Sequence, residues 1–209
     1  MEWWHTIELP DGTVTPGRVD YRGEAGKCFL LPDDLTGKRV LDFGTYDGFW
    51  AIEAKKRGAR FVMASDRFPQ MLETARLALR AYDISYCVGD LDFPIVNPGE
   101  FDVVLFYGIL YHLKNPFMGL WNAANCCKPG GLVIVETAVN QGKLAGLDPS
   151  IPLLWVIDEL HHGDPTNYYV PNEAAVAQLC KMAGLQPLEA VQGHPGYPRH
   201  TLKCQKGAL

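Results

Sequence analysis

The sequence predicts an α/β fold in which helices cover both faces of a mostly parallel sheet. Short, continuously apolar segments alternate with segments of helical spacing from residue 38 onward. Strands that are apolar on both faces are typical of parallel sheets buried between helices. The last two expected strands follow one another without a helix, which predicts an antiparallel pair at the end of the chain.

Apolar runs and helix signals place each element. The helix after the first strand ends at Gly58, the next one begins at Pro69, and the last one ends at Gly184. The expected strands cover residues 39–43, 60–65, 84–88, 101–106, 132–137, 188–191 and 200–204, and the expected helices cover residues 49–57, 69–82, 117–127 and 172–183.

Three parts of the chain are distinguished by their patterns. Residues 1–37 form an expected cap segment, in which an alternating stretch turns on Asp11-Gly12 and predicts a hairpin. Residues 38–209 form the main domain. Within it, residues 139–169 are rich in Gly, Pro, Asp and His, and we expect this long connection to be a lid over a substrate.

Composition limits the function classes. The chain has 209 residues, 47% of them hydrophobic, and a net charge of −5, which is ordinary for one globular domain. Nucleic-acid binding requires clustered cations, but the one basic run, at residues 55–57, ends an expected helix. No apolar run reaches the ~20 residues of a membrane span. Six cysteines without a CxxC spacing predict reduced thiols, and we expect a cytoplasmic protein.

Residues 42–48 follow the first strand, where open α/β sheets bind ligands. Dinucleotide-binding turns carry G-x-G-x-x-G there, but this turn reads Asp42-x-Gly44-x-x-x-Gly48. Tyr46 occupies the place where a glycine would admit a pyrophosphate, and no Gly-Lys-Ser/Thr follows as in a Walker loop. Because Asp42 repels a phosphate and attracts a cation, the turn predicts a ligand with an ammonium group.

The ends of the next two strands complete this prediction. Asp66, followed by Arg67, can accept the hydroxyls of a ribose. Asp90 and Leu91 place an acceptor beside an apolar side chain, as a slot for adenine requires. Each Asp alone is equally consistent with capping of the next helix. Together they predict S-adenosylmethionine, held by Asp42, Gly44, Gly48, Asp66, Arg67, Asp90 and Leu91.

The segments VLDFGTYDG, VMASD, GDLDF, FDVVLFYGILYHLKNP and KPGGLVIVET resemble class I S-adenosylmethionine-dependent methyltransferases across most of residues 36–205. The resemblance implies a Rossmann-like, seven-stranded sheet with a reversed final strand. The segments WWHTIELPDGTVTPG and GILYH are similar to a subgroup akin to the tRNA wobble-uridine carboxymethyltransferases, in which an aromatic residue at the turn, here Tyr46, is common.

Within that subgroup, Tyr111 matches the tyrosine that helps to hold a carboxylated cofactor, and Tyr107 lies just before it. The chain departs from those tRNA enzymes because it is acidic and lacks their long N-terminal extension and a basic surface. We therefore expect ordinary S-adenosylmethionine as the cofactor, with Tyr107 and Tyr111 beside it. The resemblance further implies that Tyr46 packs over the cofactor.

Candidates for acceptor chemistry follow the fourth and fifth strands. His112 is a candidate general base, and equally a structural histidine bonded to backbone. Glu136 could receive a substrate hydroxyl or amine, or tie down the loop that follows it.

The long connection and the cap segment add further candidates. His161 is expected to be a base on the lid, and His162 and Tyr168 to contact the substrate. Adjacent histidines project differently, and no other ligands of fixed spacing accompany them, so we expect no metal. His5 would join the pocket if the cap segment folds over the cofactor; packing on the sheet is the alternative.

Three functions remain open at this point. The first is an enzyme that methylates an oxygen or nitrogen of a small-molecule metabolite, in specialised biosynthesis. The second is a tRNA-modifying methyltransferase or carboxymethyltransferase. The third is a non-catalytic module that binds the cofactor and a protein partner. We expect the first, with a small-molecule acceptor and neither nucleic acid nor membrane as a partner.

Overall fold

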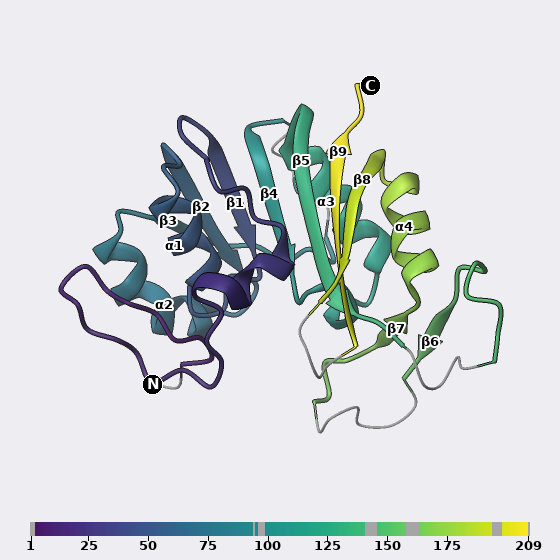
Figure 1. Cartoon of the computed structure of the whole chain (residues 1–209), viewed down its shortest axis with the longest axis horizontal. Helices are drawn as coiled ribbons and strands as arrows, with labels where there is room; N and C mark the ends of the chain where they lie inside the picture. The colour runs from purple at the N-terminus through teal and green to yellow at the C-terminus, as the bar shows by residue number, and fades with distance from the viewer. Residues whose placement is uncertain are drawn as a thin grey trace.

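The computed structural model describes residues 3–93, 95, 99–140, 146–157, 164–193 and 198–208. Within them lies a seven-stranded sheet of order β3-β2-β1-β4-β5-β9-β8 (Figure 1). Neighbouring strands from β3 to β5 are parallel, whereas β9 is antiparallel to both β5 and β8. The expected parallel sheet with a reversed final strand is confirmed, and the reversed strand is inserted between β5 and β8.

Every expected strand and helix is present, with ends within a few residues of the prediction. The exception is β5, which begins at Cys127 because this residue already pairs with Phe101 before a register shift. The strands are β1 (Arg39–Phe43), β2 (Phe61–Asp66), β3 (Ser85–Val88), β4 (Phe101–Tyr107), β5 (Cys127–Ala138), β8 (Leu185–Gln192) and β9 (Arg199–Lys206). The helices are α1 (Phe49–Lys56), α2 (Pro69–Ala81), α3 (Pro116–Cys126) and α4 (Glu173–Met182).

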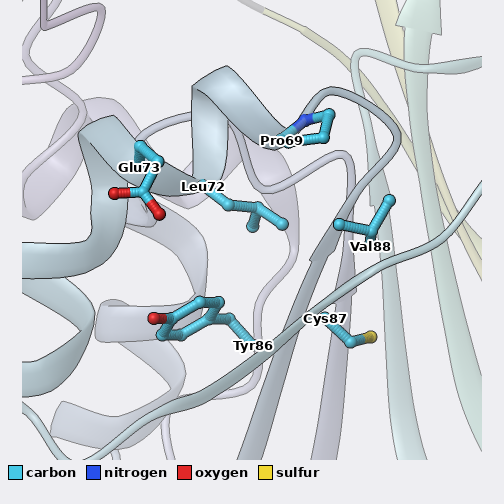
Figure 2. A pocket seen from close by; sticks show the side chains of 6 residues that line it. All are labelled: Pro69, Leu72, Glu73, Tyr86, Cys87 and Val88. Atoms are coloured by element: carbon cyan, nitrogen blue, oxygen red, sulfur yellow. The ribbon is translucent and has the colours of Figure 1, made fainter.

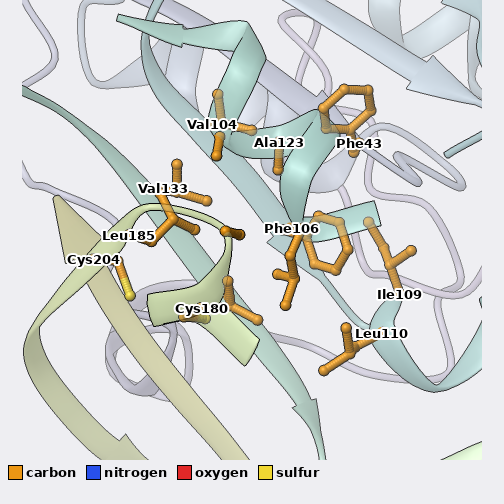
Figure 3. Close-up of a cluster of buried hydrophobic side chains, with 14 of the residues drawn as sticks. Phe43, Val104, Phe106, Ile109, Leu110, Ala123, Val133, Cys180, Leu185 and Cys204 are labelled. Carbon is orange, nitrogen blue, oxygen red and sulfur yellow. The ribbon is translucent and has the colours of Figure 1, made fainter. Parts of the chain in front are cut away.

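Two apolar clusters cover the two faces of the sheet. Successive side chains of a strand point to opposite faces, so Val103 and Leu105 of β4 pack in the cluster that includes α1 and α2. Val104 and Phe106 pack in the other cluster, with α3 and α4 (Figure 3). This double coverage explains why the parallel strands are apolar without alternation.

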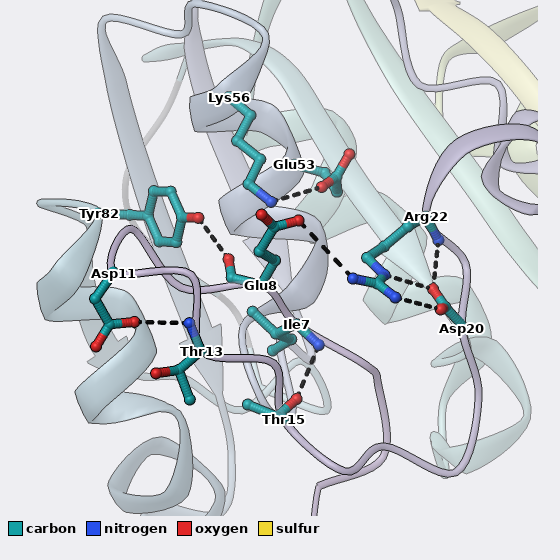
Figure 4. Close-up of polar contacts among 10 residues, drawn as sticks. All are labelled: Ile7, Glu8, Asp11, Thr13, Thr15, Asp20, Arg22, Glu53, Lys56 and Tyr82. Atoms are coloured by element: carbon teal, nitrogen blue, oxygen red, sulfur yellow. Dashed lines mark hydrogen bonds and ion pairs between the residues drawn. The ribbon is translucent and has the colours of Figure 1, made fainter.

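The N-terminal segment packs on the α1 and α2 side of the sheet. Glu8 and Val14 form an antiparallel bridge around the expected Asp11-Gly12 turn. The segment is tied to the domain by Tyr82, which ends α2 and whose hydroxyl donates to the Glu8 carbonyl (Figure 4). A 3₁₀ helix that was not expected, η1 (Gly23–Phe29), then leads toward β1.

The long connection contains regular structure that the sequence analysis missed. A short strand, β6 (Leu154–Val156), pairs antiparallel with β7 (Tyr169–Pro171). Outside this connection, a 3₁₀ turn that was also not expected, η2 (Leu110–His112), follows β4. The β6–β7 pair and the N-terminal segment both lie toward the lower end of the sheet in Figure 1, where the parallel strands end.

Candidate active site

The turn after β1 has the backbone geometry of a glycine-rich loop, with a tyrosine in it. Gly44 and Gly48 have φ of +60° and +90°, and a Cβ on Gly48 would lie 2.8 Å from Leu79 Cδ2. Tyr46 also adopts the left-handed region, with φ of +53°, which is uncommon for a bulky residue. The residue is 37% exposed, so it lies at the surface of the turn.

Asp66 fixes this turn from the end of β2. Its Oδ2 accepts the Tyr46 N–H at 3.1 Å, and its Oδ1 accepts the Phe68 N–H at 2.9 Å. Each carboxylate oxygen can accept a further hydrogen bond. Asp66 can therefore hold the turn and still accept ribose hydroxyls.

The electrostatics of the turn favour a cationic ligand. Asp42 is 1% exposed, and burial raises its pKa to about 7, with a further rise from Asp66 and Asp47. Burial also raises the pKa of Asp66. Within the described part of the chain, neither Asp42 nor Asp66 forms an ion pair; Asp42 accepts a hydrogen bond from the Thr45 hydroxyl at 2.7 Å. Because a cation compensates such carboxylates, they fit the ammonium and sulfonium groups of S-adenosylmethionine better than a phosphate.

The loop after β3 lies beside the end of β2. Gly89 donates its N–H to the Asp66 carbonyl, and Arg67 Nη1 lies 3.7 Å from Asp92 Oδ2. Asp90 caps the turn by accepting the Asp92 N–H at 3.0 Å, and the Leu91 side chain is buried. The structure thus brings the predicted residues of β1, β2 and β3 to one edge of the sheet.

A second group of polar side chains lies where β5 ends and β9 begins, and it consists of Glu136, Arg199 and Tyr111. Arg199 forms a bidentate ion pair with Glu136, with Nη2 at 2.8 Å from Oε2. Both Nη atoms lie 3.4 Å from the Tyr111 hydroxyl, and the guanidinium stacks 5.3 Å from the Tyr111 ring centroid. Burial alone would lower the pKa of Arg199, but Glu136 outweighs it and raises the pKa. The guanidinium is therefore charged near neutral pH.

His112 lies next to this group at the end of η2. Its ring centroid is 4.2 Å from that of Tyr111, and its Nδ1 is within hydrogen-bond distance of the hydroxyl and carbonyl oxygens of Thr166. Burial lowers the pKa of His112, so the imidazole is neutral near pH 7. The Tyr168 N–H donates to the Tyr111 carbonyl at 2.8 Å, which joins the long connection to η2.

Two predicted site residues contact other parts of the protein. The Tyr107 hydroxyl donates to the Phe29 carbonyl at 2.9 Å, and its ring packs 4.9 Å from that of Trp50. The His5 ring stacks on Phe49 at 4.9 Å and bonds to Asp47 through Nδ1. These contacts favour packing for Tyr107 and attachment of the N-terminal segment for His5.

His161, His162 and Asp158 lie outside the described residues. Among residues that the structure does describe, no three metal-ligating side chains come together. The same residues include no helix long and apolar enough to cross a membrane.

A hollow of about 190 Å³ lies apart from these groups, between α2 and the edge strand β3 (Figure 2). None of the predicted site residues lines it, and its walls carry one carboxylate among mainly apolar groups. The lining residues are Pro69, Leu72, Glu73, Tyr86, Cys87 and Val88.

Sequence reasoning missed several polar residues of this edge. Arg199 could have been found, because a reversed last strand begins beside the end of β5, and Arg199 pairs in register with Ala138. Asp47 directly precedes the last glycine of the turn, but its role is evident only from its contact with His5, 42 residues away. Asp164 and Thr166 form an Asp-x-Thr turn. The sequence of this turn does not indicate its contact with His112.

Comparisons with known proteins agree with this geometry. A family model for methyltransferase domains matches residues 19–190. A ubiquinone biosynthesis O-methyltransferase of Neisseria meningitidis serogroup C is 35% identical over 179 residues, which cover 82% of this chain and 71% of that protein. A tRNA U34 carboxymethyltransferase of Methylococcus capsulatus is 29% identical over 168 residues, 77% of this chain but 48% of that protein.

Solved structures agree with the fold. An S-adenosylmethionine-dependent methyltransferase of Mesorhizobium loti superimposes with a TM-score of 0.68 at 17% identity, over 84% of this chain and 94% of that one. The family match covers most of the chain, and the strand order with its inserted reversed strand is the one that the resemblance implied. The chain belongs to the methyltransferase family and is a class I S-adenosylmethionine-dependent methyltransferase.

Proposed function

We propose that this chain methylates a hydroxyl group of a small-molecule acceptor, with His112 as the general base. The observation that carries the proposal is a half-buried, neutral histidine at the edge of the sheet where the parallel strands end, beside Tyr111 and the Glu136–Arg199 pair. A neutral imidazole suits removal of a hydroxyl proton near pH 7. The similarity to an O-methyltransferase of ubiquinone biosynthesis points to the same class of acceptor.

S-adenosylmethionine supplies a methyl group on a sulfonium when it is bound. We propose that Asp42 faces its cationic arm, that Asp66 accepts the ribose hydroxyls, and that Asp90 and Leu91 flank the adenine. Tyr46 and Arg67 would close over the same ligand from the turn and from the end of β2.

His112 Nε2 would take the acceptor proton while the acceptor oxygen bonds to the methyl carbon and the carbon–sulfur bond breaks. The positive charge lost at sulfur is then matched by the charge gained on the imidazolium. Glu136 and Arg199 form a neutral pair beside the reacting groups, where they can orient the acceptor without adding net charge. Tyr168, whose backbone is tied to Tyr111, would contribute to the acceptor wall.

Modification of tRNA is the alternative that the carboxymethyltransferase relatives suggest. A carboxylated cofactor needs a cation for its extra carboxylate, and Arg199 beside Tyr111 is the candidate. Its guanidinium is already matched by Glu136, which favours ordinary S-adenosylmethionine. The net charge of −5 also argues against binding of a polyanion.

The test supplies purified protein with S-adenosylmethionine that carries a labelled methyl group. One sample receives an ultrafiltrate of cell extract as the source of small acceptors, and a second receives bulk tRNA. We expect the labelled methyl group to appear in a small molecule of the ultrafiltrate sample. Label in tRNA would transfer the proposal to the tRNA alternative, and cofactor binding without any labelled product would favour a non-catalytic module.

A further inference from the structure

His112 is held by a chain of hydrogen bonds that reaches beyond the residues assigned above. Its Nδ1 lies 2.9 Å from Thr166 Oγ1 and 3.2 Å from the Thr166 carbonyl oxygen. Thr166 Oγ1 in turn lies 2.6 Å from Asp164 Oδ1. The Thr166 N–H donates to the same carboxylate oxygen at 2.8 Å.

Counting the protons fixes the tautomer of the ring. A hydroxyl has one proton to donate, and the Thr166 hydroxyl donates it to the Asp164 carboxylate, which can only accept. The Thr166 carbonyl can also only accept. Both oxygens near Nδ1 therefore require a donor, so Nδ1 carries the proton and Nε2 keeps its lone pair.

We propose that Asp164 and Thr166 are positioning residues that hold His112 in the Nδ1–H tautomer and so direct Nε2 toward the acceptor. The proposal rests on the proposed role of His112 as the base. Among the described residues, Nε2 has no hydrogen-bond partner of its own, which leaves it available. Asp164 and Thr166 would thus orient the His112 ring, as a buried carboxylate orients the histidine in hydrolase triads.

The turn geometry alone does not account for this contact. Asp148 and Ser150 form the same kind of turn, with the Ser150 hydroxyl 2.7 Å and its N–H 2.9 Å from Asp148 Oδ1, but no histidine of the described residues bonds to it. The two turns thus share their local hydrogen bonds. They differ because the Thr166 hydroxyl also lies within hydrogen-bond distance of His112 Nδ1. Ser150→Ala is therefore a matched control for the loss of a hydroxyl from such a turn.

The first measurement is the nitrogen chemical shift of the His112 ring in protein labelled with ¹⁵N-histidine, assigned by comparison with His112→Gln. We expect the Nδ1–H tautomer in the unaltered protein. In Asp164→Ala the Thr166 hydroxyl is free to donate, so a population of the Nε2–H tautomer should appear. Thr166→Val removes one of the two acceptors at Nδ1 but keeps the carbonyl, so it should shift the tautomer less than Asp164→Ala does. Thr166→Ser should match the unaltered protein. An Nε2–H ring in the unaltered protein, or no change in Asp164→Ala, would overturn the proposal.

The second measurement is the pH dependence of turnover. Asp164 raises the pKa of His112, while burial, Arg67 and Arg199 lower it, and the Tyr111 ring packs against it. Removing the carboxylate should move the acid limb of kcat/KM to lower pH and reduce kcat by about tenfold or more, with the KM for S-adenosylmethionine unchanged. Ser150→Ala should change neither.

These two measurements separate the proposals. A changed tautomer with unchanged turnover would support the positioning role and remove His112 as the base. Reduced turnover with an unchanged tautomer and an unmoved acid limb would show that Asp164 and Thr166 act only through folding of the loop, and would overturn the inference.

Discussion

Asp47, in the turn after β1, binds the N-terminal segment through three atoms, two of His5 and one of Trp4. The carboxylate accepts the His5 N–H at 2.7 Å and the ring Nδ1 bonds to it at 2.6 Å, while the Trp4 N–H donates at 2.9 Å. Asp47 is fully buried and adjoins Tyr46, the residue that Asp66 holds. The N-terminal segment is therefore attached directly to the turn that we assign to the cofactor.

Replacing Asp47 with Ala should lower the free energy of unfolding by about 3 kcal/mol, because it leaves buried N–H groups without an acceptor. Chemical denaturation measures this loss. Asp20→Ala is the control, since Asp20 pairs with Arg22 at the surface, and a change within about 0.5 kcal/mol is expected there. Equal losses in the two variants would show that Asp47 does not anchor the segment.

S-adenosylmethionine should bind and NAD should not, because Tyr46 fills the place of a pyrophosphate and buried carboxylates line the turn. Isothermal titration with each ligand decides this. Tight binding of NAD, with no heat from the methyl donor, would contradict the assignment of the turn.

Asp66→Ala should weaken binding of S-adenosylmethionine by about 1–3 kcal/mol, through the loss of charge-assisted hydrogen bonds. This corresponds to roughly 5- to 150-fold in Kd. Asp102→Ala is a matched control at the opposite end of the sheet, where Asp102 accepts the Arg39 N–H at 2.8 Å. Unchanged affinity in Asp66→Ala would remove Asp66 from the site.

Asp42 should make cofactor affinity depend on pH. Its pKa is about 7 in the folded protein, against an ordinary value of 3.8, so Asp42 favours folding most at low pH, and this contribution falls as pH rises from about 4 to 7. A cationic ligand favours the ionised carboxylate and should displace its proton. Affinity should thus rise between about pH 6 and 8, with proton release on binding.

Titration calorimetry in two buffers of different ionisation enthalpy detects that proton release. In Asp42→Asn the release and the rise in affinity should both vanish, because the side chain no longer titrates. Proton release that persists in Asp42→Asn would assign the titrating group elsewhere.

The sheet was predictable because each strand carries its own signal. β1 and β4 are continuous apolar runs, which only a doubly covered parallel sheet buries, and Gly58 and Pro69 mark the helix ends locally. Asp42 and Asp66 were predictable for the same reason: the ends of parallel strands share one edge. Local patterns were therefore enough for the fold and for the candidates on β1 and β2.

The remaining contacts join residues that are distant in sequence. Arg199 meets Glu136 63 residues away, and Thr166 meets His112 54 residues away. No periodicity encodes such pairings, and the β6–β7 strands are too short to stand out in a connection rich in Gly and Pro. Only the assembled edge shows that a residue of the long connection contacts the His112 ring.

Replacing His112 with Gln should reduce turnover by roughly 100-fold or more and leave cofactor affinity nearly intact, since a general base acts in the chemical step. Gln keeps a polar side chain of similar length but cannot take a proton from the acceptor. His200→Gln is the control, because His200 is a histidine whose pKa is likewise lowered by burial, but it points to the opposite face of β9 from Arg199. Steady-state kinetics with the acceptor found in the labelling experiment, together with calorimetry, gives both quantities. If His112→Gln keeps full activity, the acceptor arrives already deprotonated or another group takes the proton, and the proposed role of His112 is wrong.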